Sequence, residues 1–381
     1  MATKKYSYID SIRGYAVVMV LLTHVFAFGG GDANPDIFFA KVWVQCRMGV
    51  MLFYIISALT LFLSYDQKIK TEKYPVKNFF TRRFFRIVPL FYFACIYEII
   101  INRFDLVNII GTLTFTNGFM PKYMHGLIIG GWSIAVESVF YFMIPILFRK
   151  VNNIQKSILF FAISLVFAII LKIIAFRYLG AFLSSEILTM WTHYWLPLQL
   201  PVFALGIFLY FLLFKSNFKI AEPTAFNKYL SYLLICLAFY FFIIASYGQK
   251  LFMYENIAFS LILVLFVIGM ALYQSIAFDN KMFQFLGKIS YSFYILHPIV
   301  IDTIGRPFWE RLAHSTTPAR GFMICFLLLF LITTGFAFLS YKFIEQPFQD
   351  LGSRIIKRRE SLKNDNNNNT ALTTFGSQVS I

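Results

Sequence analysis

The chain has 381 residues, of which 59% are hydrophobic and only 14% are charged, and 48 of them are phenylalanine. This composition excludes an ordinary soluble globular protein and is typical of a chain that crosses a lipid bilayer many times. The formal net charge is +16. We interpret this charge as a consequence of membrane topology, so the sequence predicts no nucleic-acid partner. The four cysteines show no metal-binding spacing, and we expect no metal.

Ten segments are apolar and long enough to cross a bilayer. In chain order they cover residues 12–28, 43–64, 84–102, 132–148, 157–176, 194–214, 229–246, 256–276, 286–304 and 320–342. The sequence therefore predicts an all-α, polytopic membrane protein with about ten transmembrane helices. No internal repeat is visible, which disfavours the transporters that are built from repeats.

The basic residues are distributed unevenly between the predicted loops. With the N-terminus in the cytoplasm, the most basic stretches all fall on the cytoplasmic side, at residues 68–86, 149–156, 215–228 and 354–363. The positive-inside rule therefore predicts a multi-pass protein of the cell membrane with both termini in the cytoplasm. We assign residues 1–350 to the membrane domain. Residues 351–381 are basic and then Asn-rich, and we expect them to form a disordered cytoplasmic tail.

The first apolar segment carries two polar side chains, Arg13 and His24. They are close to three helical turns apart, so they project from nearly the same helix face, about 16 Å from each other. Because hydrocarbon penalises charged and titratable groups, this alignment indicates a polar passage. His24 is a candidate base or nucleophile, since an imidazole changes protonation near neutral pH. The alternative is a histidine that is hydrogen-bonded to a neighbouring helix.

Three arginines, Arg82, Arg83 and Arg86, lie at the start of the third apolar segment. Guanidinium groups bind phosphate through paired hydrogen bonds, and a helix N-terminus also favours anions. The cluster is therefore a candidate phosphate site. The alternative is a basic anchor in the lipid headgroups.

Polar side chains also form stripes on two later segments. Ser133, Glu137 and Tyr141 recur every four residues, and a glutamate inside a membrane is costly unless it is paired or protonated. Glu137 is expected to orient His24, to bind a hydroxylated substrate or to pair with an arginine. In the ninth segment Ser290, Tyr294 and His297 form a similar stripe, which indicates either a substrate contact or a hydrogen-bond network between helices. The sequence Glu345-Gln-Pro347 is interpreted as a helix terminator near the cytoplasmic face.

Taken in order, these motifs resemble those of the acyltransferase-3 family of integral membrane O-acyltransferases, over about residues 6–348. The resemblance rests on Asp10-Ser-Ile-Arg13-Gly14 with His24, Phe53 with Ser57, Arg83-Phe-Phe-Arg86, Trp132-Ser133-x3-Glu137, Ser290-Tyr-x2-Tyr294-x2-His297 and Glu345-x-Pro347. One departure is Ala58, where many members have a glycine after the serine.

The resemblance implies that an acyl group passes from cytoplasmic acyl-CoA, usually acetyl-CoA, to a hydroxyl of an extracytoplasmic glycan. Such acceptors include the O-antigen of lipopolysaccharide, exopolysaccharide and lipid-linked saccharides. We expect His24 and Glu137 to be catalytic, with His24 acting either as general base or as a transient acyl carrier. The remaining expected site residues bind acyl-CoA (Arg13, Arg82, Arg83 and Arg86) or the acceptor (Trp132, Ser133, Tyr294 and His297). The alternative function is transport of a small polar or anionic solute.

Overall fold

The computed structural model describes residues 6–28, 40–216, 224–247, 255–313 and 316–376, and the side chains of 313, 318 and 362–376 are not described. Within these ranges the chain is helical and has no β-strand. Its elements are α1 (Ser7–Phe28), α2 (Ala40–Gln45), η2 (Cys46–Met48), α3 (Gly49–Ile69), α4 (Pro75–Ile101), α5 (Leu106–Leu113), η3 (Asn117–Phe119), η4 (Pro121–Tyr123), α6 (Gly131–Lys150), α7 (Ile154–Leu179), α8 (Ser185–Tyr194), α9 (Leu196–Phe214), α10 (Ala225–Tyr247), α11 (Glu255–Leu272), α12 (Lys281–Lys288), α13 (Ser290–Val300), η5 (Ile301–Gly305), α14 (Arg306–Ala313), α15 (Pro318–Ser340), η6 (Tyr341–Glu345) and α16 (Gln346–Gly376).

The prediction of an all-α polytopic membrane protein is confirmed. In the described ranges, nine helices are long and apolar enough to cross a membrane, and they coincide with nine of the ten predicted segments. The exception is the segment at 286–304, which spans the break between α12 and α13 and continues through η5. His297 and Asp302 within this stretch, and Arg306 just after it, make it less apolar than the others, although α13, η5 and α14 follow one another without interruption.

Side-chain caps fix where several helices begin. Asp105 accepts a hydrogen bond from the backbone N–H of Asn108 at the start of α5, and Asn153 accepts one from Lys156 at the start of α7. Asn280 accepts bonds from two backbone N–H groups at the start of α12. These caps satisfy amide groups that have no partner inside the helix.

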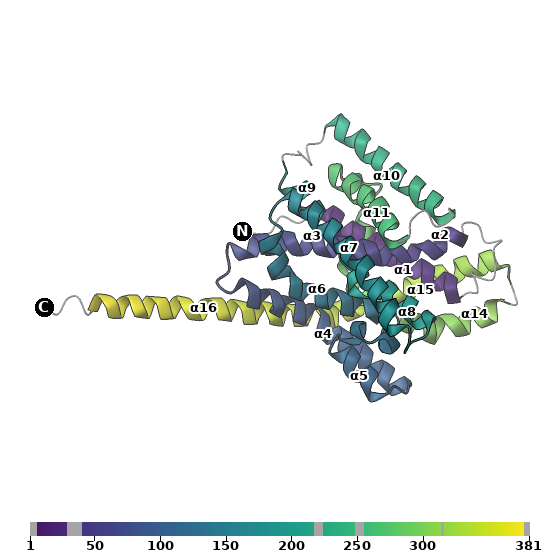
Figure 1. Ribbon diagram of the computed structural model, residues 1–381, viewed down its shortest axis with the longest axis horizontal. Coiled ribbons are helices and arrows are strands. Elements are labelled where there is room, and N and C mark those ends of the chain that lie inside the picture. The colour runs from purple at the N-terminus through teal and green to yellow at the C-terminus, as the bar shows by residue number, and fades with distance from the viewer. Residues whose placement is uncertain (1–5, 29–39, 217–223, 248–254, 314–315, 377–381) are drawn as a thin grey trace.

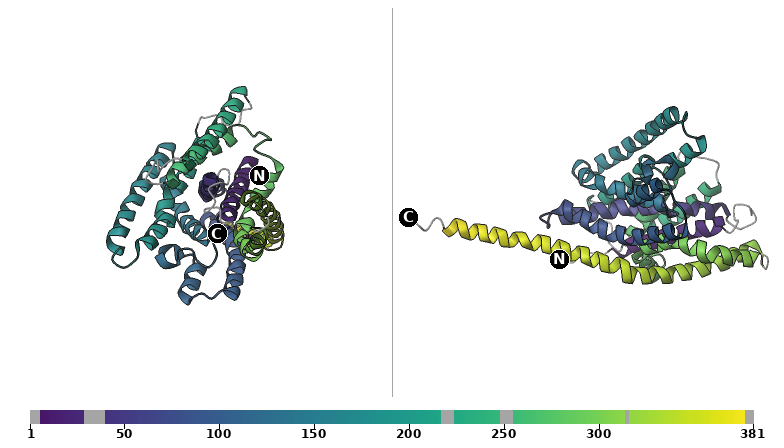
Figure 2. Two further views of the ribbon diagram at one scale, coloured as in Figure 1. Left: turned by 90° about the vertical axis from the view of Figure 1, so that its right-hand side faces the viewer. Right: turned by 90° about the horizontal axis from the view of Figure 1, so that it is seen from below.

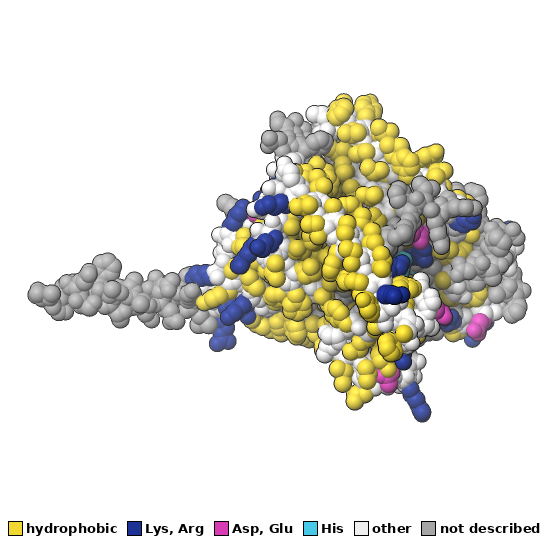
Figure 3. Space-filling view, viewed as in Figure 1, with side chains coloured by type: hydrophobic (Ala, Val, Ile, Leu, Met, Phe, Trp, Pro, Cys, Tyr) yellow, Lys and Arg dark blue, Asp and Glu magenta, His cyan; other side chains and the backbone are white. Residues whose placement is uncertain are grey.

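The centre of the molecule is formed by α1, α3 and α9, and α7 and α10 lie on its outside (Figures 1 and 2). Close packing at the centre depends on glycine. A Cβ on Gly14 would lie 2.3 Å from the carbonyl oxygen of Phe283, and one on Gly287 would lie 1.7 Å from that of Asp10, so α1 and α12 are nearly in backbone contact. Figure 3 shows hydrophobic side chains over the middle of the molecule, as expected for a surface that faces lipid.

The helix α15 continues through the π-helix η6 into α16, which extends beyond the rest of the molecule (Figures 1 and 2). The interpretation of Glu345-Gln-Pro347 as a helix terminator is therefore wrong, because Pro347 lies at the start of α16, where its missing N–H is tolerated within the π-helical turn.

The expected disorder of residues 351–381 is also wrong for residues 351–361. Glu360 accepts hydrogen bonds from the backbone N–H groups of Lys73 and Tyr74 and from the Asn78 side chain, at 3.0, 3.2 and 2.7 Å. Arg359 donates to Asn78 at 2.8 Å. This part of α16 is therefore bound to the N-terminus of α4, and α16 remains helical as far as Gly376. Composition alone did not reveal these long-range contacts.

Candidate active site

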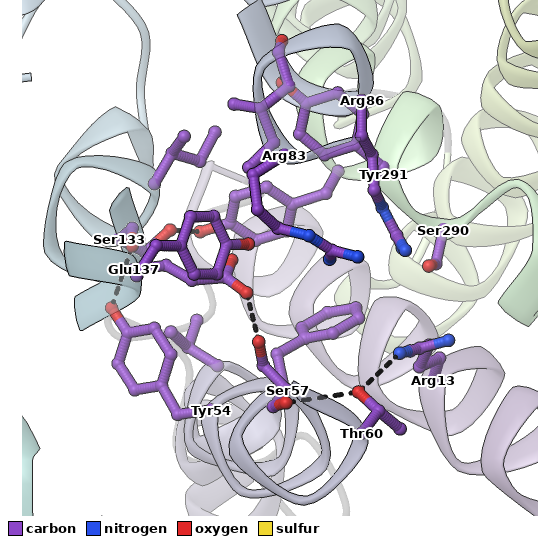
Figure 4. Close-up of a pocket in the computed structure, with 16 residues that line it drawn as sticks. Arg13, Tyr54, Ser57, Thr60, Arg83, Arg86, Ser133, Glu137, Ser290 and Tyr291 are labelled. Carbon is purple, nitrogen blue, oxygen red and sulfur yellow. Dashed lines mark hydrogen bonds between the residues drawn. The ribbon is translucent and has the colours of Figure 1, made fainter. Parts of the chain in front are cut away.

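A cavity of about 80 Å³ lies between α1, α3, α4, α6 and α13, and it collects most of the polar residues singled out in the sequence (Figure 4). Its lining consists of Arg13, Val50, Phe53, Tyr54, Ser57, Thr60, Arg83, Arg86, Ile87, Ser133, Ile134, Glu137, Tyr141, Ser290, Tyr291 and Tyr294. Three arginines and one glutamate are present, so the charged groups of the lining favour an anion.

The three arginines come from two helices and point into the same space (Figure 4). Arg13 on α1 donates to Thr60 on α3 at 3.1 Å and lies 3.6 Å from the Asp10 carboxylate. Arg83 and Arg86 are one helical turn apart on α4, so they approach the cavity from the same face.

Arg83 is held by aromatic rings, with its guanidinium carbon 5.8 Å from the ring centres of Phe79 and Tyr141. Its Nε is buried and has no hydrogen-bond partner among the described residues. Buried donors are normally satisfied, so this nitrogen is available to an acceptor that enters the cavity. The arrangement fits an anion with several oxygens, such as a phosphate group.

Glu137 on α6 also lines the cavity and accepts a short hydrogen bond from Ser57 on α3. The expectation that Glu137 orients His24 is not supported, because no hydrogen bond joins these residues in the described part of the chain. Ser57 instead fixes the carboxylate beside the arginines. On the same helix, Tyr54 donates to the backbone carbonyl of Ser133 at 3.2 Å and joins α3 to α6.

Ser133 and Tyr294 meet directly, with 2.7 Å between their hydroxyl oxygens. The backbone carbonyl of Gly130 lies 2.8 Å from the Ser133 hydroxyl and 3.2 Å from the Tyr294 hydroxyl, so one hydroxyl donates to this carbonyl while the other donates across the pair. Gly130 has a φ of +83°, and a Cβ there would lie 3.0 Å from the Tyr294 hydroxyl. The glycine before α6 is thus required both by its backbone conformation and by the close approach of the tyrosine.

His24 and His297 do not line the cavity but lie against each other. Nε2 of His297 is 3.1 Å from Nδ1 of His24, and the ring centres are 5.0 Å apart. Nδ1 of His297 is 2.7 Å from the backbone carbonyl of Tyr294, and Nδ1 of His24 is 2.9 Å from that of Val20. Tyr294 therefore connects the histidine pair to the cavity.

These distances determine the tautomers of the neutral pair. A carbonyl oxygen only accepts, so Nδ1 of His297 carries the proton that bonds to Tyr294. Nε2 of His297 is then an acceptor, and Nδ1 of His24 must donate to it. Nε2 of His24 is left without a proton and with its lone pair available. The pair thus holds His24 in the form that a general base requires.

Besides the two histidines, two further predicted site residues do not line the cavity. Arg82 makes two hydrogen bonds to Glu72, at 2.7 and 3.2 Å, and this ion pair joins α4 to the preceding turn. Its assignment to donor binding is not supported, because its guanidinium is paired with Glu72 and it does not line the cavity. Trp132 is buried against Tyr194 and Tyr54, with ring centres 4.4 and 6.4 Å away. Its contacts are those of a packing residue.

The cavity also contains residues to which the sequence analysis gave no role. Ser57 and Thr60 lie on one face of α3, and Tyr291 lies beside Ser290 at the start of α13. A polar stripe on an otherwise apolar helix was the available signal for Ser57 and Thr60. Tyr291 is half-buried, and its hydroxyl donates to the carbonyl of Ile87 at 2.6 Å, a contact that no sequence pattern predicts.

An all-α membrane domain with a basic cavity and an adjacent imidazole pair has the features of a membrane-bound group-transfer enzyme. The chain belongs to the acyltransferase-3 family, whose model, described as an acyltransferase domain, matches residues 6–342. This membership favours acyl transfer over the alternative of solute transport.

Curated relatives agree with this assignment. The chain is 27% identical to "Putative O-acetyltransferase SACOL0978" of Staphylococcus aureus strain COL, over 94% of this chain and 60% of the relative. It is 24% identical to "O-acetyltransferase OatA" of S. aureus strain NCTC 8325, over 90% of this chain and 57% of the relative. A third relative is "Putative acetyltransferase ORF330" of Acidianus two-tailed virus, 23% identical over 78% of this chain and 84% of the relative.

The chain thus spans about three fifths of the length of the staphylococcal relatives. No solved structure matches it.

Proposed function

We propose that the protein transfers an acetyl group from acetyl-CoA at the cytoplasmic side of the membrane to a hydroxyl of an extracytoplasmic glycan, such as O-antigen or exopolysaccharide. The observation that carries this proposal is the continuity between a cavity with three arginines and the His24–His297 pair, through Tyr294. The names of the relatives support O-acetylation.

The arginines are the proposed contacts for the donor. Coenzyme A carries several phosphates, which cannot enter hydrocarbon without compensating charge. Arg83 and Arg86 supply that charge, and the unpartnered Nε of Arg83 supplies a donor for a phosphate oxygen. Arg13 continues the positive charge toward α1, which carries His24. Arg82 is not part of this proposal, because Glu72 already neutralises it.

His24 is the proposed catalytic base. Nε2 of His24 takes the proton of the acceptor hydroxyl while the hydroxyl oxygen attacks the thioester carbonyl carbon. An ester C–O bond forms, the C–S bond breaks, and the thiolate of CoA leaves and takes up the proton from His24. Glu137, held by Ser57, is proposed to accept a hydrogen bond from substrate beside the arginines.

The proposed orientation follows from the distribution of charge. Lys and Arg side chains lie at the end of the molecule from which α16 projects, and others lie at the opposite end beside Asp and Glu side chains (Figure 3). The N-terminal end of α4 and the start of α16 lie at the first of these ends, so the positive-inside rule supports a cytoplasmic position for this end. We propose that the arginine cavity is then reached from the compartment that contains acetyl-CoA.

Reconstitution tests the proposal directly. Purified protein in sealed vesicles would receive acetyl-labelled acetyl-CoA on one side and a purified O-antigen or exopolysaccharide fraction on the other. We expect label on the glycan and release of one free thiol per acetyl group transferred, both absent with His24→Ala. Transfer of label by His24→Ala at the normal rate would contradict the proposed chemistry. Release of thiol without a labelled glycan would contradict the proposed acceptor.

A further inference from the structure

A second cavity, of about 400 Å³, lies between α1, α2, α10, α11 and α12, and its lining is entirely apolar. Tyr15 and Phe283 close one end of it, with their rings stacked 3.8 Å apart. Val42 and Ile243 lie at the other end, on α2 and α10. Its volume falls in the range of cavities that hold ligands.

This cavity is separate from the candidate active site. The residues of α1 that line it include Val18, Met19 and Leu22, whereas Arg13 and His24 project from the opposite side of the same helix. The two cavities share no lining residue. An occupant of the apolar cavity is therefore not in contact with the groups proposed to carry out acyl transfer.

The lining determines the kind of molecule that fits. Water is not stable in such a cavity, because no polar group is present to form hydrogen bonds with it. An empty cavity would deprive the surrounding side chains of dispersion contacts. Phe239 lines the cavity and is also 50% exposed at the outside of α10, where hydrocarbon surrounds the protein. A lipid chain can therefore enter from the bilayer.

The charge at one end of the cavity determines the kind of headgroup. Lys41 precedes Val42 on α2, and its Nζ lies 5.5 Å from the ring centre of Tyr247, one turn beyond Ile243 on α10. Arg47 on the same side is neutralised by Glu255 at 2.7 Å, whereas Lys41 has no acidic partner among the described residues. An amine in this position attracts an anionic headgroup.

We propose that this cavity binds one chain of an anionic phospholipid, with the phosphate of the headgroup beside Lys41. The bound lipid fills the space between α1 and the α10–α11 pair. The site selects for anionic lipid through Lys41 and for a hydrocarbon chain through the apolar lining. This proposal does not depend on the proposed function.

Fluorescence quenching tests the proposal, because Trp43 lines the cavity. The protein would be reconstituted in phosphatidylcholine with increasing amounts of phosphatidylglycerol or phosphatidylcholine that carries brominated chains. The fluorescence of Trp43 is obtained by subtracting the emission of the Trp43→Phe variant from that of the unmodified protein. One lysine near a membrane surface contributes a preference of about fivefold for anionic over neutral lipid. Brominated phosphatidylglycerol should therefore quench Trp43 at about one fifth of the concentration that brominated phosphatidylcholine requires.

Matched variants separate a specific site from the general lipid surroundings. Lys41→Gln should remove the preference, and the exposed Lys122→Gln should keep it. Ala238→Phe, which places a ring in the cavity, should reduce quenching of Trp43, whereas Leu233→Phe on the exposed face of α10 should not. Native mass spectrometry of the purified protein should detect one bound phospholipid, lost in Ala238→Phe.

Equal quenching by the two brominated lipids in the unmodified protein would overturn the proposal, since it would indicate unselective contact with the bilayer. A bound mass that corresponds to a lipid-linked saccharide would also overturn it. If Ala238→Phe does not fold, Lys41→Gln decides the outcome alone, because an exposed lysine is not required for the helix packing.

Discussion

Nε2 of His297 lies 3.1 Å from Nδ1 of His24, and both rings are tied to backbone carbonyls of their own helices. The pair joins α1 to α13 and leaves one nitrogen, Nε2 of His24, free of hydrogen-bond partners among the described residues. We therefore expect the two histidines to have different roles, and their substitution to have different consequences.

Substitution of His24 by alanine is expected to abolish acyl transfer while the protein still inserts and binds acetyl-CoA. General base catalysis typically contributes about 10²–10⁴-fold to a rate, which exceeds the effect of a packing defect. The measurement is the rate of glycan labelling by purified protein, together with acetyl-CoA affinity from calorimetry. Normal turnover with His24→Ala would show that another residue is the base.

His297→Ala is expected to reduce the rate less than His24→Ala, because it removes the partner that orients His24 and not the base itself. Orienting partners of metal-bound histidines contribute roughly 10- to 100-fold, and we expect a similar loss here. His297→Gln should recover part of the rate, since an amide oxygen can accept the proton of His24 Nδ1. If His297 had only a structural role, His297→Ala and His297→Gln would have equal rates at equal stability.

Arg83→Gln is expected to weaken acetyl-CoA binding by about 10- to 150-fold, the equivalent of one hydrogen bond to a charged group. Arg82→Gln is the matched control on the neighbouring position. It should leave affinity unchanged and lower thermal stability by a few degrees, because Glu72 loses its paired contact. Equal losses of affinity in both variants would favour a general effect of charge over a specific phosphate site.

The effect of truncating α16 on stability should depend on whether Arg359 and Glu360 are retained. Removal of residues 362–381 leaves Arg359 and Glu360 in place, and activity and melting temperature should remain close to those of the full chain. Removal of residues 353–381 deletes both side chains and exposes the N-terminus of α4, so the protein should melt at a lower temperature. Identical melting curves for the two truncations would show that the contacts do not stabilise α4.

Topology can be tested with single cysteines in a cysteine-free background. Lys70 and Lys122 are exposed and lie in loops that the positive-inside rule assigns to opposite sides. Lys122→Cys should react with a membrane-impermeant maleimide in intact cells, and Lys70→Cys should react only after permeabilisation. The reverse pattern would invert the proposed orientation.

The sequence predicted the helices well because hydrophobicity and length determine which segments enter a bilayer. It also identified Arg13, Arg83 and Arg86, since a charge in an apolar segment is conspicuous. The partner of each polar residue was harder to predict. Glu137 bonds to Ser57, which lies 80 positions earlier, and periodicity within one helix contains no information about such a contact.

Arg82 illustrates a second limit. Neighbouring arginines look equivalent in a sequence, yet successive helix positions differ by about 100° in direction. Arg83 therefore enters the cavity while Arg82 meets Glu72. The contacts of Glu360 were hidden for a similar reason, because the polar composition of residues 351–381 is compatible both with disorder and with a helix that docks through its side chains.

The close packing of Gly14 against α12 has a consequence for how α1 tolerates changes in length. Each inserted residue would turn the following part of the helix by about 100° and move it by about 1.5 Å. One extra residue between Gly14 and His24 would carry the imidazole away from His297 and toward the apolar cavity, while Arg13 stayed in place. The contact of Gly14 with α12 thus fixes the rotation of α1 about its axis, and the contact of His24 with His297 depends on that rotation. A single deletion elsewhere in that interval would restore the spacing and with it both contacts.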